Sequence, residues 1–287
     1  MARQGLRTLC FASREITNWS DDIDPQDIMP EEIERDLHLL CVTGVEDLLQ
    51  DDVKSCIEDF RHAGISVWML TGDKGLTAQE IGVSCGLISQ EAKEATAMEA
   101  QAVAETVPTV GPAAGSPAKK SVRIFTISEN DTDVEALYDE LRGINVLRTD
   151  YKKYQVVISG VTIALVLKTP RLHQTIGEIL LGCESAIVYR SSPAQKADVV
   201  DFMKSRTNNA VTAAIGDGAN DVNMIQQAHL GFGLMGKEGN QASAFSDYAF
   251  PRFKDLRRAL FWHGRPFALR LNNFVIWCLF KSVTNAA

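Results

Sequence analysis

The sequence predicts an α/β protein in which a parallel β-sheet is flanked by helices. Short apolar segments suited to strands alternate along the chain with longer segments suited to helices. Strand, helix, strand at this spacing is typical of parallel β-α-β units, because parallel strands need a crossover connection of a dozen or more residues. Polar loops of matching character follow three of the strands, and we expect them to meet at one edge of the sheet.

The first half of the chain supplies the beginning of this pattern. Apolar runs predict strands at residues 5–12, 38–43 and 65–70. Amphipathic segments predict helices at residues 51–63 and 76–85. The last strand and the helix after it frame the first of the polar loops.

The pattern breaks near Ser89 and resumes near residue 155. Residues 90–120 are rich in Ala and Glu and then in Pro, Gly and Ser, which predicts a flexible insertion. A weaker ordered stretch follows at 122–154. Further strands are expected at 155–158, 185–189, 210–215 and 230–234, and further helices at 171–181, 193–205 and 221–228.

Length and composition narrow the class of protein. The chain has 287 residues, a formal net charge of −8, 45% hydrophobic residues and 23% charged residues, which is the profile of a globular protein with one or two domains. The acidic balance, without any Lys/Arg-rich block, argues against a nucleic-acid partner. The six cysteines form no C-x-x-C pair and fit reduced thiols in a cytosolic setting. The polar start of the sequence predicts no secretory signal.

The last 22 residues, 266–287, have a different composition. They are apolar and aromatic, and Arg270 and Lys281 interrupt them. A membrane span needs roughly 20 mostly apolar residues. Hydropathy alone therefore leaves two alternatives open, a buried or amphipathic helix and a membrane span, and favours the former.

Two of the polar loops carry groups suited to phosphate. Thr71 offers a hydroxyl, and the backbone N–H groups of Gly72 and Asp73 can approach a phosphate oxygen closely. Lys196, one turn into its predicted helix, can reach back toward phosphate as a point charge. Each loop taken alone also fits an ordinary turn and helix start.

The third loop is the most specific. Asp217 and Asp221 are four residues apart across a glycine turn, and two carboxylates at a strand end suit Mg²⁺. Gly216 and Gly218 let the backbone bend sharply, and Asn220 can act as a cap or a positioning amide. Ordinary turns do not explain why all three loops occur together in this order.

The order of these loops resembles the later motifs of the haloacid dehalogenase superfamily. The segments 70–74 (LTGDK) and 214–225 (AIGDGANDVNMI) look like the phosphorylation domain of a P-type ATPase. Further segments resemble the type IV class, the phospholipid flippases: 5–9, 46–51, 192–196, 238–242, 246–249 and 263–265. The resemblance extends over the chain except for about residues 90–150.

The resemblance implies a domain organisation. Residues 1–36 would be the end of a nucleotide-binding domain and its connector. Residues 37–265 would be a phosphorylation domain with a Rossmann-like, haloacid dehalogenase-like parallel sheet. Residues 266–287 would be the start of the fifth transmembrane helix, which reverses the preference from hydropathy.

The resemblance also implies roles for individual residues. Thr71, Lys196, Asp217 and Asp221 would be catalytic, with Asp217 and Asp221 holding Mg²⁺. Nucleotide or phosphate contacts would come from Arg7, Thr71, Gly72, Asp73, Arg190, Lys196, Asn220 and Asp221. Lys281 would be a candidate for lipid transport.

The sequence departs from the family at several points. The family's phosphorylated aspartate lies in the motif Asp-Lys-Thr-Gly-Thr, which this chain lacks, as it lacks the Thr-Gly-Glu motif of the actuator domain. Ser159 stands where the family has an aspartate before Gly160. Because covalent catalysis requires the nucleophile, we expect no phosphoenzyme from this chain alone.

The function expected from the sequence is therefore part of an ATP-driven phospholipid flippase. Such a machine hydrolyses ATP with Mg²⁺ through an aspartyl-phosphate and moves phospholipid across a membrane, with its catalytic part on the cytosolic side. The resemblance also makes an accessory subunit a candidate partner. Two alternatives stay open. One is a haloacid dehalogenase-type phosphatase, and the other is a non-catalytic module that binds nucleotide and Mg²⁺.

Overall fold

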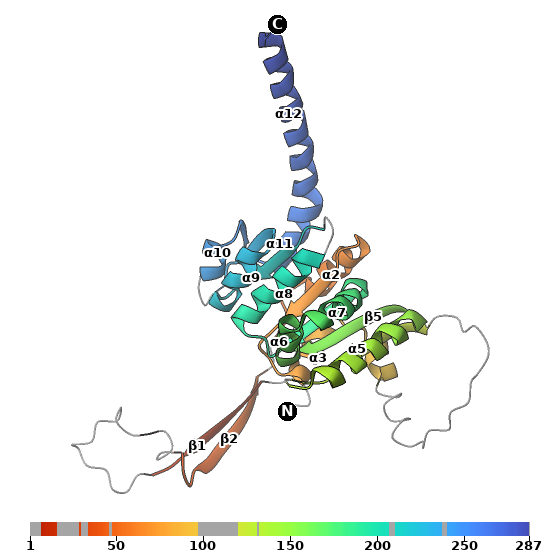
Figure 1. Cartoon of the computed structure of the whole chain (residues 1–287). Helices are drawn as coiled ribbons and strands as arrows, with labels where there is room; N and C mark the ends of the chain where they lie inside the picture. Colours follow the sequence, from red (N-terminus) through yellow and green to blue (C-terminus); the bar gives the residue numbers. More distant parts are fainter. Residues whose placement is uncertain are drawn as a thin grey trace. The chain divides into compact units, whose positions relative to one another are not determined.

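Figure 1 shows a computed structural model of the chain, which describes residues 7–15, 29, 34–45, 48–96, 120–130, 132–206, 210–236 and 240–286. The chain divides into two compact units, Met1–Leu48 and Leu49–Ala287. Each unit is described by itself below. Most of the insertion predicted at residues 90–120 lies outside the described residues.

The first unit contains an antiparallel pair of strands. Strand β1, Arg7–Ser13, pairs with β2, His38–Val45, with a register shift between Phe11 and Ala12. Both strands are predicted from the sequence. All residues of β2 are exposed, including Leu39 and Leu40, so this apolar strand is not buried by its own unit.

The second unit contains two parallel sheets. The larger has the order β3-β6-β5-β4, and every neighbouring pair in it is parallel. Its strands are Val67–Leu70 (β3), Ser185–Tyr189 (β6), Tyr151–Ser159 (β5) and Lys120–Thr126 (β4). Strand β6 is fully buried, which is typical of a parallel strand covered by helices on both faces.

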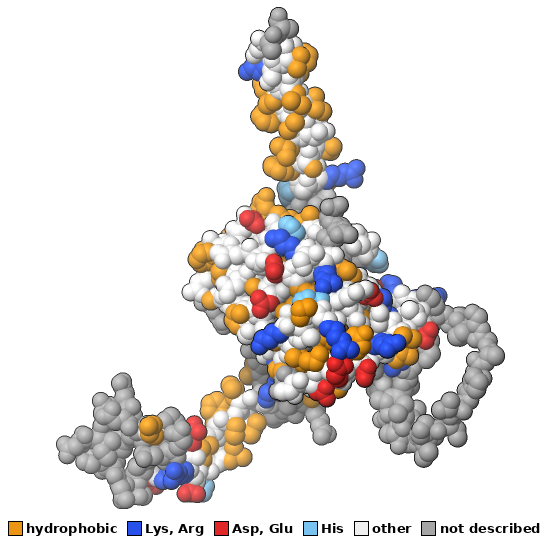
Figure 2. Space-filling model, in the orientation of Figure 1, with side chains coloured by type: hydrophobic (Ala, Val, Ile, Leu, Met, Phe, Trp, Pro, Cys, Tyr) orange, Lys and Arg blue, Asp and Glu red, His pale blue; other side chains and the backbone are white. Residues whose placement is uncertain are grey.

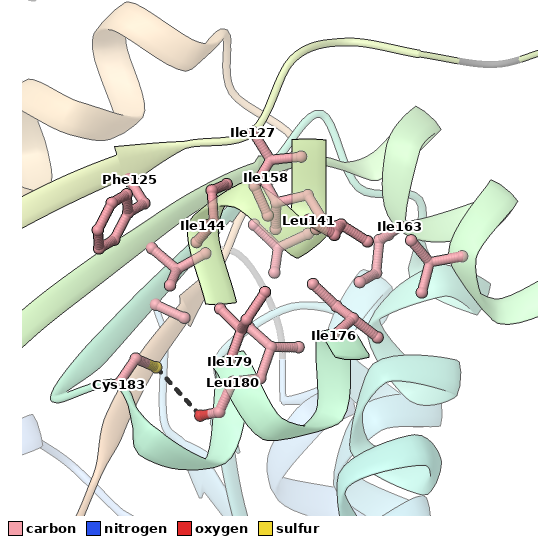
Figure 3. Packing of buried hydrophobic residues seen from close by; sticks show 14 of the residues in the cluster. Phe125, Ile127, Leu141, Ile144, Ile158, Ile163, Ile176, Ile179, Leu180 and Cys183 are labelled. Atoms are coloured by element: carbon pink, nitrogen blue, oxygen red, sulfur yellow. Dashed lines mark hydrogen bonds between the residues drawn. The ribbon is translucent and has the colours of Figure 1, made fainter. Parts of the chain in front are cut away.

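Alternate side chains of each strand enter different cores. In β6, Ala186 and Val188 face the largest hydrophobic cluster, whereas Ile187 and Tyr189 face a second one. Figure 3 shows the largest cluster, in which strand side chains meet residues of the covering helices. The helices that cover this face are α5 (Val134–Leu147), α6 (Gly160–Lys168), α7 (Pro170–Gly182) and α8 (Pro193–Arg206).

The spacing of apolar residues and the capping residues explain why the covering helices form where they do. In α5, Leu137, Leu141 and Ile144 recur at helical spacing and are buried. Asp133 caps this helix by accepting a hydrogen bond of 3.0 Å from the backbone N–H of Ala136. The stretch 122–154, which the sequence predicts only as weakly ordered, therefore contains a complete strand and helix.

The opposite face of the larger sheet is covered by α3, Gly75–Ser84, and the chain after it, with α2, Val53–His62, beside them. Helix α3 packs closely at Gly82, where a Cβ atom would lie 2.5 Å from Cδ1 of Ile187. A larger residue at this position would push the helix away from the sheet.

The smaller sheet has the order β7-β8-β9 and is also parallel. Its strands are Ala213–Gly216, Leu230–Leu234 and Tyr248–Phe250. Helices α9 (Val222–Gln227), α10 (Gln241–Ala244) and α11 (Phe253–Arg258) accompany it. Val67 of β3 and Ile215 of β7 pack against the same cluster, which includes Cys56 and Phe60 of α2.

The predicted single parallel sheet is thus present as two pieces. Parallel strands and flanking helices are confirmed, but no backbone ladder between β3 and β7 occurs in the described part of the chain. The apolar pattern of a strand predicts that it is buried but does not say which strand is its neighbour. The position of the break therefore could not be read from the pattern.

The chain continues from α11 through a π-helical turn, Ala259–His263, into α12, Gly264–Ala286. Hydrophobic side chains are exposed along α12, as Figure 2 shows, and they include Phe267, Phe274 and Trp277. Among the described residues, no helix combines the length and apolarity needed to cross a membrane.

Candidate functional site

The loops that follow β3 and β6 are joined by backbone hydrogen bonds. The N–H of Thr71 donates to the carbonyl of Val188 over 2.9 Å, which extends the β3–β6 ladder by one residue. The N–H of Arg190 donates to the carbonyl of Asp73 over 3.0 Å, and the N–H of Ser191 donates to that of Thr71 over 2.9 Å. Two of the three predicted loops therefore lie side by side.

Thr71 and Asp73 shape the first loop between them. The Thr71 hydroxyl donates to the Asp73 carboxylate over 2.9 Å and accepts from the Asp73 N–H over 3.1 Å. A Cβ atom on Gly72 would meet only the Ser191 carbonyl, at 3.8 Å, which is ordinary contact. Packing within this chain therefore does not require glycine at position 72.

The third loop is joined to the second by a buried ion pair. Nζ of Lys196, at the start of α8, lies 2.8 Å from Oδ1 of Asp221, in the turn after β7. Both residues are buried. Because α8 follows the end of β6 and Asp221 follows the end of β7, this ion pair places the carboxyl ends of the two strands at one edge.

Gly216 makes room for this ion pair. A Cβ atom at position 216 would lie 2.3 Å from Cβ and 2.7 Å from Oδ2 of Asp221, a separation that real Cβ atoms do not show. Position 218 needs glycine for a similar reason, because a Cβ atom there would lie 2.3 Å from Oδ1 of Asn220. The glycines of this motif are thus explained by close approach of the acidic and amide side chains.

Asp217 and Asp221 have contrasting surroundings despite their proximity in sequence. Asp217 is exposed, whereas Asp221 is buried beside Lys196. Across the ranges that the structure describes, no group of three or more His, Cys, Asp or Glu side chains forms a metal-binding cluster. An exposed and a buried carboxylate still provide the hard oxygen ligands that Mg²⁺ takes together with water and phosphate.

Arg190 has an unusual backbone and a partner that the sequence did not predict. Its φ of 52° lies in the left-handed region, which is uncommon for a residue other than glycine. Its Nη1 atom lies 3.1 Å from Oε1 and 3.4 Å from Oε2 of Glu129. Glu129 follows β4, in the stretch predicted only as weakly ordered, so the sequence pattern contained no signal for it.

Ser159, where the resemblance led us to note a missing aspartate, serves as the N-cap of α6. Its Oγ accepts a hydrogen bond of 3.1 Å from the N–H of Thr162 and lies 2.9 Å from the Thr162 hydroxyl. Serine and aspartate are both strong N-cap residues. The substitution therefore preserves the helix start that the fold requires at the end of β5.

Two ionisable groups near these elements have shifted pKa values. Burial raises the pKa of Tyr189, and the negative charge of Glu129 raises it further. Burial raises the pKa of the Cys183 thiol to about 12, so this cysteine stays protonated and packs as an apolar residue.

Two residues with roles expected from the resemblance, Arg7 and Lys281, are distant in sequence from these loops. Arg7 begins β1 of the first unit, and its side chain is outside the described part of the structure. Lys281 lies in α12, where its Nζ is 5.4 Å from the centroid of the Trp277 ring. The roles expected for both residues remain predictions.

Comparison with curated proteins identifies similar sequences. The probable phospholipid-transporting ATPase DNF3 of Saccharomyces cerevisiae is 36% identical over 299 residues, which cover 98% of this chain and 16% of that protein. The phospholipid-transporting ATPase IH of Homo sapiens is 34% identical over 307 residues, which cover 98% of this chain and 26% of that protein. The phospholipid-transporting ATPase dnf1 of Schizosaccharomyces pombe is 35% identical over 297 residues, which cover 98% of this chain and 19% of that protein.

No protein-family model matches the chain. The chain spans between about a sixth and a quarter of the length of these curated relatives. The similarity includes the residues of all three polar loops, since it extends over 98% of the chain. The chain is therefore homologous along its length to a segment of the phospholipid-transporting ATPases, the P4 flippases.

Proposed function

We propose that this chain is the phosphoryl-transfer segment of an ATP-driven phospholipid flippase. The observation that carries the proposal is the buried ion pair between Lys196 and Asp221. It holds an ammonium group at the strand edge where the Thr71 loop also lies, and the exposed Asp217 belongs to the same turn as Asp221. Phosphoryl transfer is catalysed largely by positioning and charge neutralisation, which this set of groups can supply.

Each loop would have a separate task in this reaction. The hydroxyl of Thr71 and the backbone of Gly72 and Asp73 would contact phosphate oxygens. Lys196 would neutralise charge on the transferred phosphoryl group, and Asp221 would fix the direction of its side chain. Asn220, which folds back over Gly218, would position an amide beside them. Arg190 would contact the nucleotide, and for Arg7 a nucleotide contact stays a separate prediction from the family resemblance.

The carboxylates fit a magnesium ion brought by the nucleotide. Asp217 is the more accessible ligand, since it is exposed, whereas one oxygen of Asp221 is already paired with Lys196. Bound Mg²⁺ would neutralise charge on the phosphate oxygens. We therefore assign the direct metal contact mainly to Asp217 and the positioning of Lys196 mainly to Asp221.

The acceptor aspartate would have to come from a strand that this sequence lacks. Strand β3 is entirely apolar and only half buried, and β3 and β7 are edge strands of their sheets, although both pack against one cluster. A parallel strand placed between them would end beside Thr71 and Asp217. We propose that the segment carrying the nucleophile occupies this place in the intact ATPase.

The expectations about the membrane belong to the same proposal. We propose that α12 is the start of a transmembrane helix in the intact machine and that Lys281 contributes to lipid transport there. The exposed apolar side chains of α12 support this assignment. We also propose phospholipid as the transported substrate, a membrane location with the catalytic part on the cytosolic side, and an accessory subunit. The homology to phospholipid-transporting ATPases supports the first of these.

A labelling experiment tests the proposal. The purified chain is incubated with Mg²⁺ and γ-labelled ATP, and nucleotide binding is measured in parallel by calorimetry. We expect Mg²⁺-ATP binding without acid-stable, hydroxylamine-labile label, because the nucleophile motif is absent. Label on the chain would show that a nucleophile had been missed, and absence of binding would refute the assigned nucleotide contacts.

A second candidate is a non-catalytic module that binds nucleotide and Mg²⁺. The missing Asp-Lys-Thr-Gly-Thr motif favours it as a description of the isolated chain. A haloacid dehalogenase-type phosphatase would share the Asp217 and Asp221 loop but needs the same kind of nucleophile. Hydrolysis of p-nitrophenyl phosphate by the chain would support the phosphatase and contradict both other candidates.

A further inference from the structure

The pair formed by Arg190 and Glu129 lies at the carboxyl edge of the larger sheet. Arg190 follows β6, and Glu129 follows β4 after two intervening residues. Nη1 of Arg190 contacts both carboxylate oxygens, at 3.1 Å and 3.4 Å. About half of each side chain is exposed, so this ion pair can open without rearrangement of a core.

The backbone of Arg190 is fixed on both sides. Its N–H donates to the Asp73 carbonyl over 3.0 Å, and its own carbonyl lies where a Cβ atom on Gly160 would approach to 2.4 Å. Its φ of 52° lies in the left-handed region, which a residue other than glycine keeps only where the surrounding structure holds it. The Arg190 side chain can move while its backbone stays in place, so its guanidinium can bind either Glu129 or another anion.

The backbone on either side of Glu129 is also held by hydrogen bonds. The N–H of Ser128 donates to the Glu140 carboxylate over 2.9 Å, and the N–H of Asn130 donates to the Thr162 hydroxyl over 3.0 Å. The Thr162 hydroxyl donates in turn to the Ser128 carbonyl over 2.9 Å. The carboxylate of Glu129 is therefore held near the guanidinium by its loop rather than by chance contact.

We propose that Glu129 is an internal anion that competes with the phosphates of a nucleoside triphosphate for Arg190. This inference rests on the proposed function, in which Arg190 contacts the nucleotide. Binding of the nucleotide exchanges one carboxylate for a phosphate group on the guanidinium.

A double-mutant cycle tests the competition. Mg²⁺-ATP binding is titrated by calorimetry on the full chain and on Glu129→Gln, Arg190→Gln and the double variant. We expect Glu129→Gln to tighten binding by about two- to fivefold, the scale of an exposed ion pair. In the Arg190→Gln background, the same substitution should leave the affinity unchanged. Glu135→Gln, which removes an exposed carboxylate paired with Arg171, is the matched control and should have no effect.

The outcomes separate this proposal from the function on which it rests. Equal affinity of the unmodified chain and Glu129→Gln would overturn the competition but leave nucleotide binding intact. Equal tightening in both backgrounds would overturn it too, because the carboxylate would then act by general repulsion and not through Arg190. Binding by neither protein would refute both proposals. Thermal unfolding of each variant checks that the fold is retained.

Discussion

Two ion pairs at the carboxyl edge of the strands have similar geometry and different surroundings. Nζ of Lys196 lies 2.8 Å from Asp221, and Nη1 of Arg190 lies 3.1 Å from Glu129. The side chains of the first pair are 5% and 11% exposed, and those of the second are 50% and 47% exposed. Burial, rather than distance, therefore separates a fixed structural pair from one that a ligand can open.

The pair formed by Arg61 and Glu184 is intermediate in exposure between these two. Glu184, just before β6, pairs with Lys153 over 2.6 Å and with Arg61, whose side chain is 20% exposed against 15% for Glu184. Burial pushes the pKa of Glu184 upward, but hydrogen bonds from Lys153 and Arg61 and their positive charges push it further down. The net pKa lies below the ordinary value of a glutamate.

The largest effect is expected from breaking the buried pair. Asp221→Ala leaves the Lys196 ammonium buried without its partner, which should lower the free energy of unfolding by about 3–5 kcal/mol. Urea denaturation measures the change. The double variant Lys196→Met/Asp221→Ala should recover part of the loss, since no uncompensated charge remains. A loss below about 1 kcal/mol for Asp221→Ala would remove the contrast between the two pairs.

An intermediate effect is expected at Glu184. Glu184→Gln should lower the free energy of unfolding at neutral pH by about 1–3 kcal/mol, because Arg61 and Lys153 lose a charged acceptor. Since the folded pKa is lowered, the stabilisation is present above the unfolded pKa, about 4.3, and disappears as pH falls through the folded pKa.

Urea denaturation between neutral pH and pH 3 measures this dependence. The difference in stability between the unmodified chain and Glu184→Gln should shrink as the pH falls. Glu135→Gln, at an exposed pair, should change stability by less than about 0.5 kcal/mol throughout. A constant difference at all pH values would contradict the lowered pKa of Glu184.

The smallest effect on stability is expected at Asp217. Because its side chain is exposed, Asp217→Ala should change the free energy of unfolding by less than about 0.5 kcal/mol. Its effect on ligand binding should be large, with loss of the Mg²⁺ dependence of ATP binding, since it removes the accessible carboxylate. Unchanged Mg²⁺ dependence in calorimetry would assign the metal contact to Asp221 instead.

The sequence predicted the strands that are apolar throughout. The predicted bounds of β6 at 185–189 and β8 at 230–234 are those observed, and helices α2, α7 and α8 are within two residues of prediction at each end. The stretch containing β4 and α5 was predicted only as weakly ordered. Its apolar residues become buried when they pack against β5 and against α7, which begins more than twenty residues after α5 ends.

The candidate site was predicted as three loops without their connections. The sequence assigned Lys196 to phosphate and Asp221 to Mg²⁺, whereas the structure pairs these side chains with each other. It contained no indication of Glu129, because a single glutamate in an irregular segment has no pattern. Side-chain pairing between distant loops depends on how the strands are ordered, and spacing along the chain does not encode that order.

The α/β class, the order of the loops and the absence of the Asp-Lys-Thr-Gly-Thr motif can all be read from the amino-acid sequence, since they depend on residue type and local spacing. The three-dimensional arrangement was needed to show that the parallel strands form two sheets, with β3 and β7 at their edges among the described residues. It also decided that one aspartate of the glycine turn is buried against Lys196 while the other is exposed. Burial arises from all surrounding elements together, and for that reason two aspartates four residues apart have different roles.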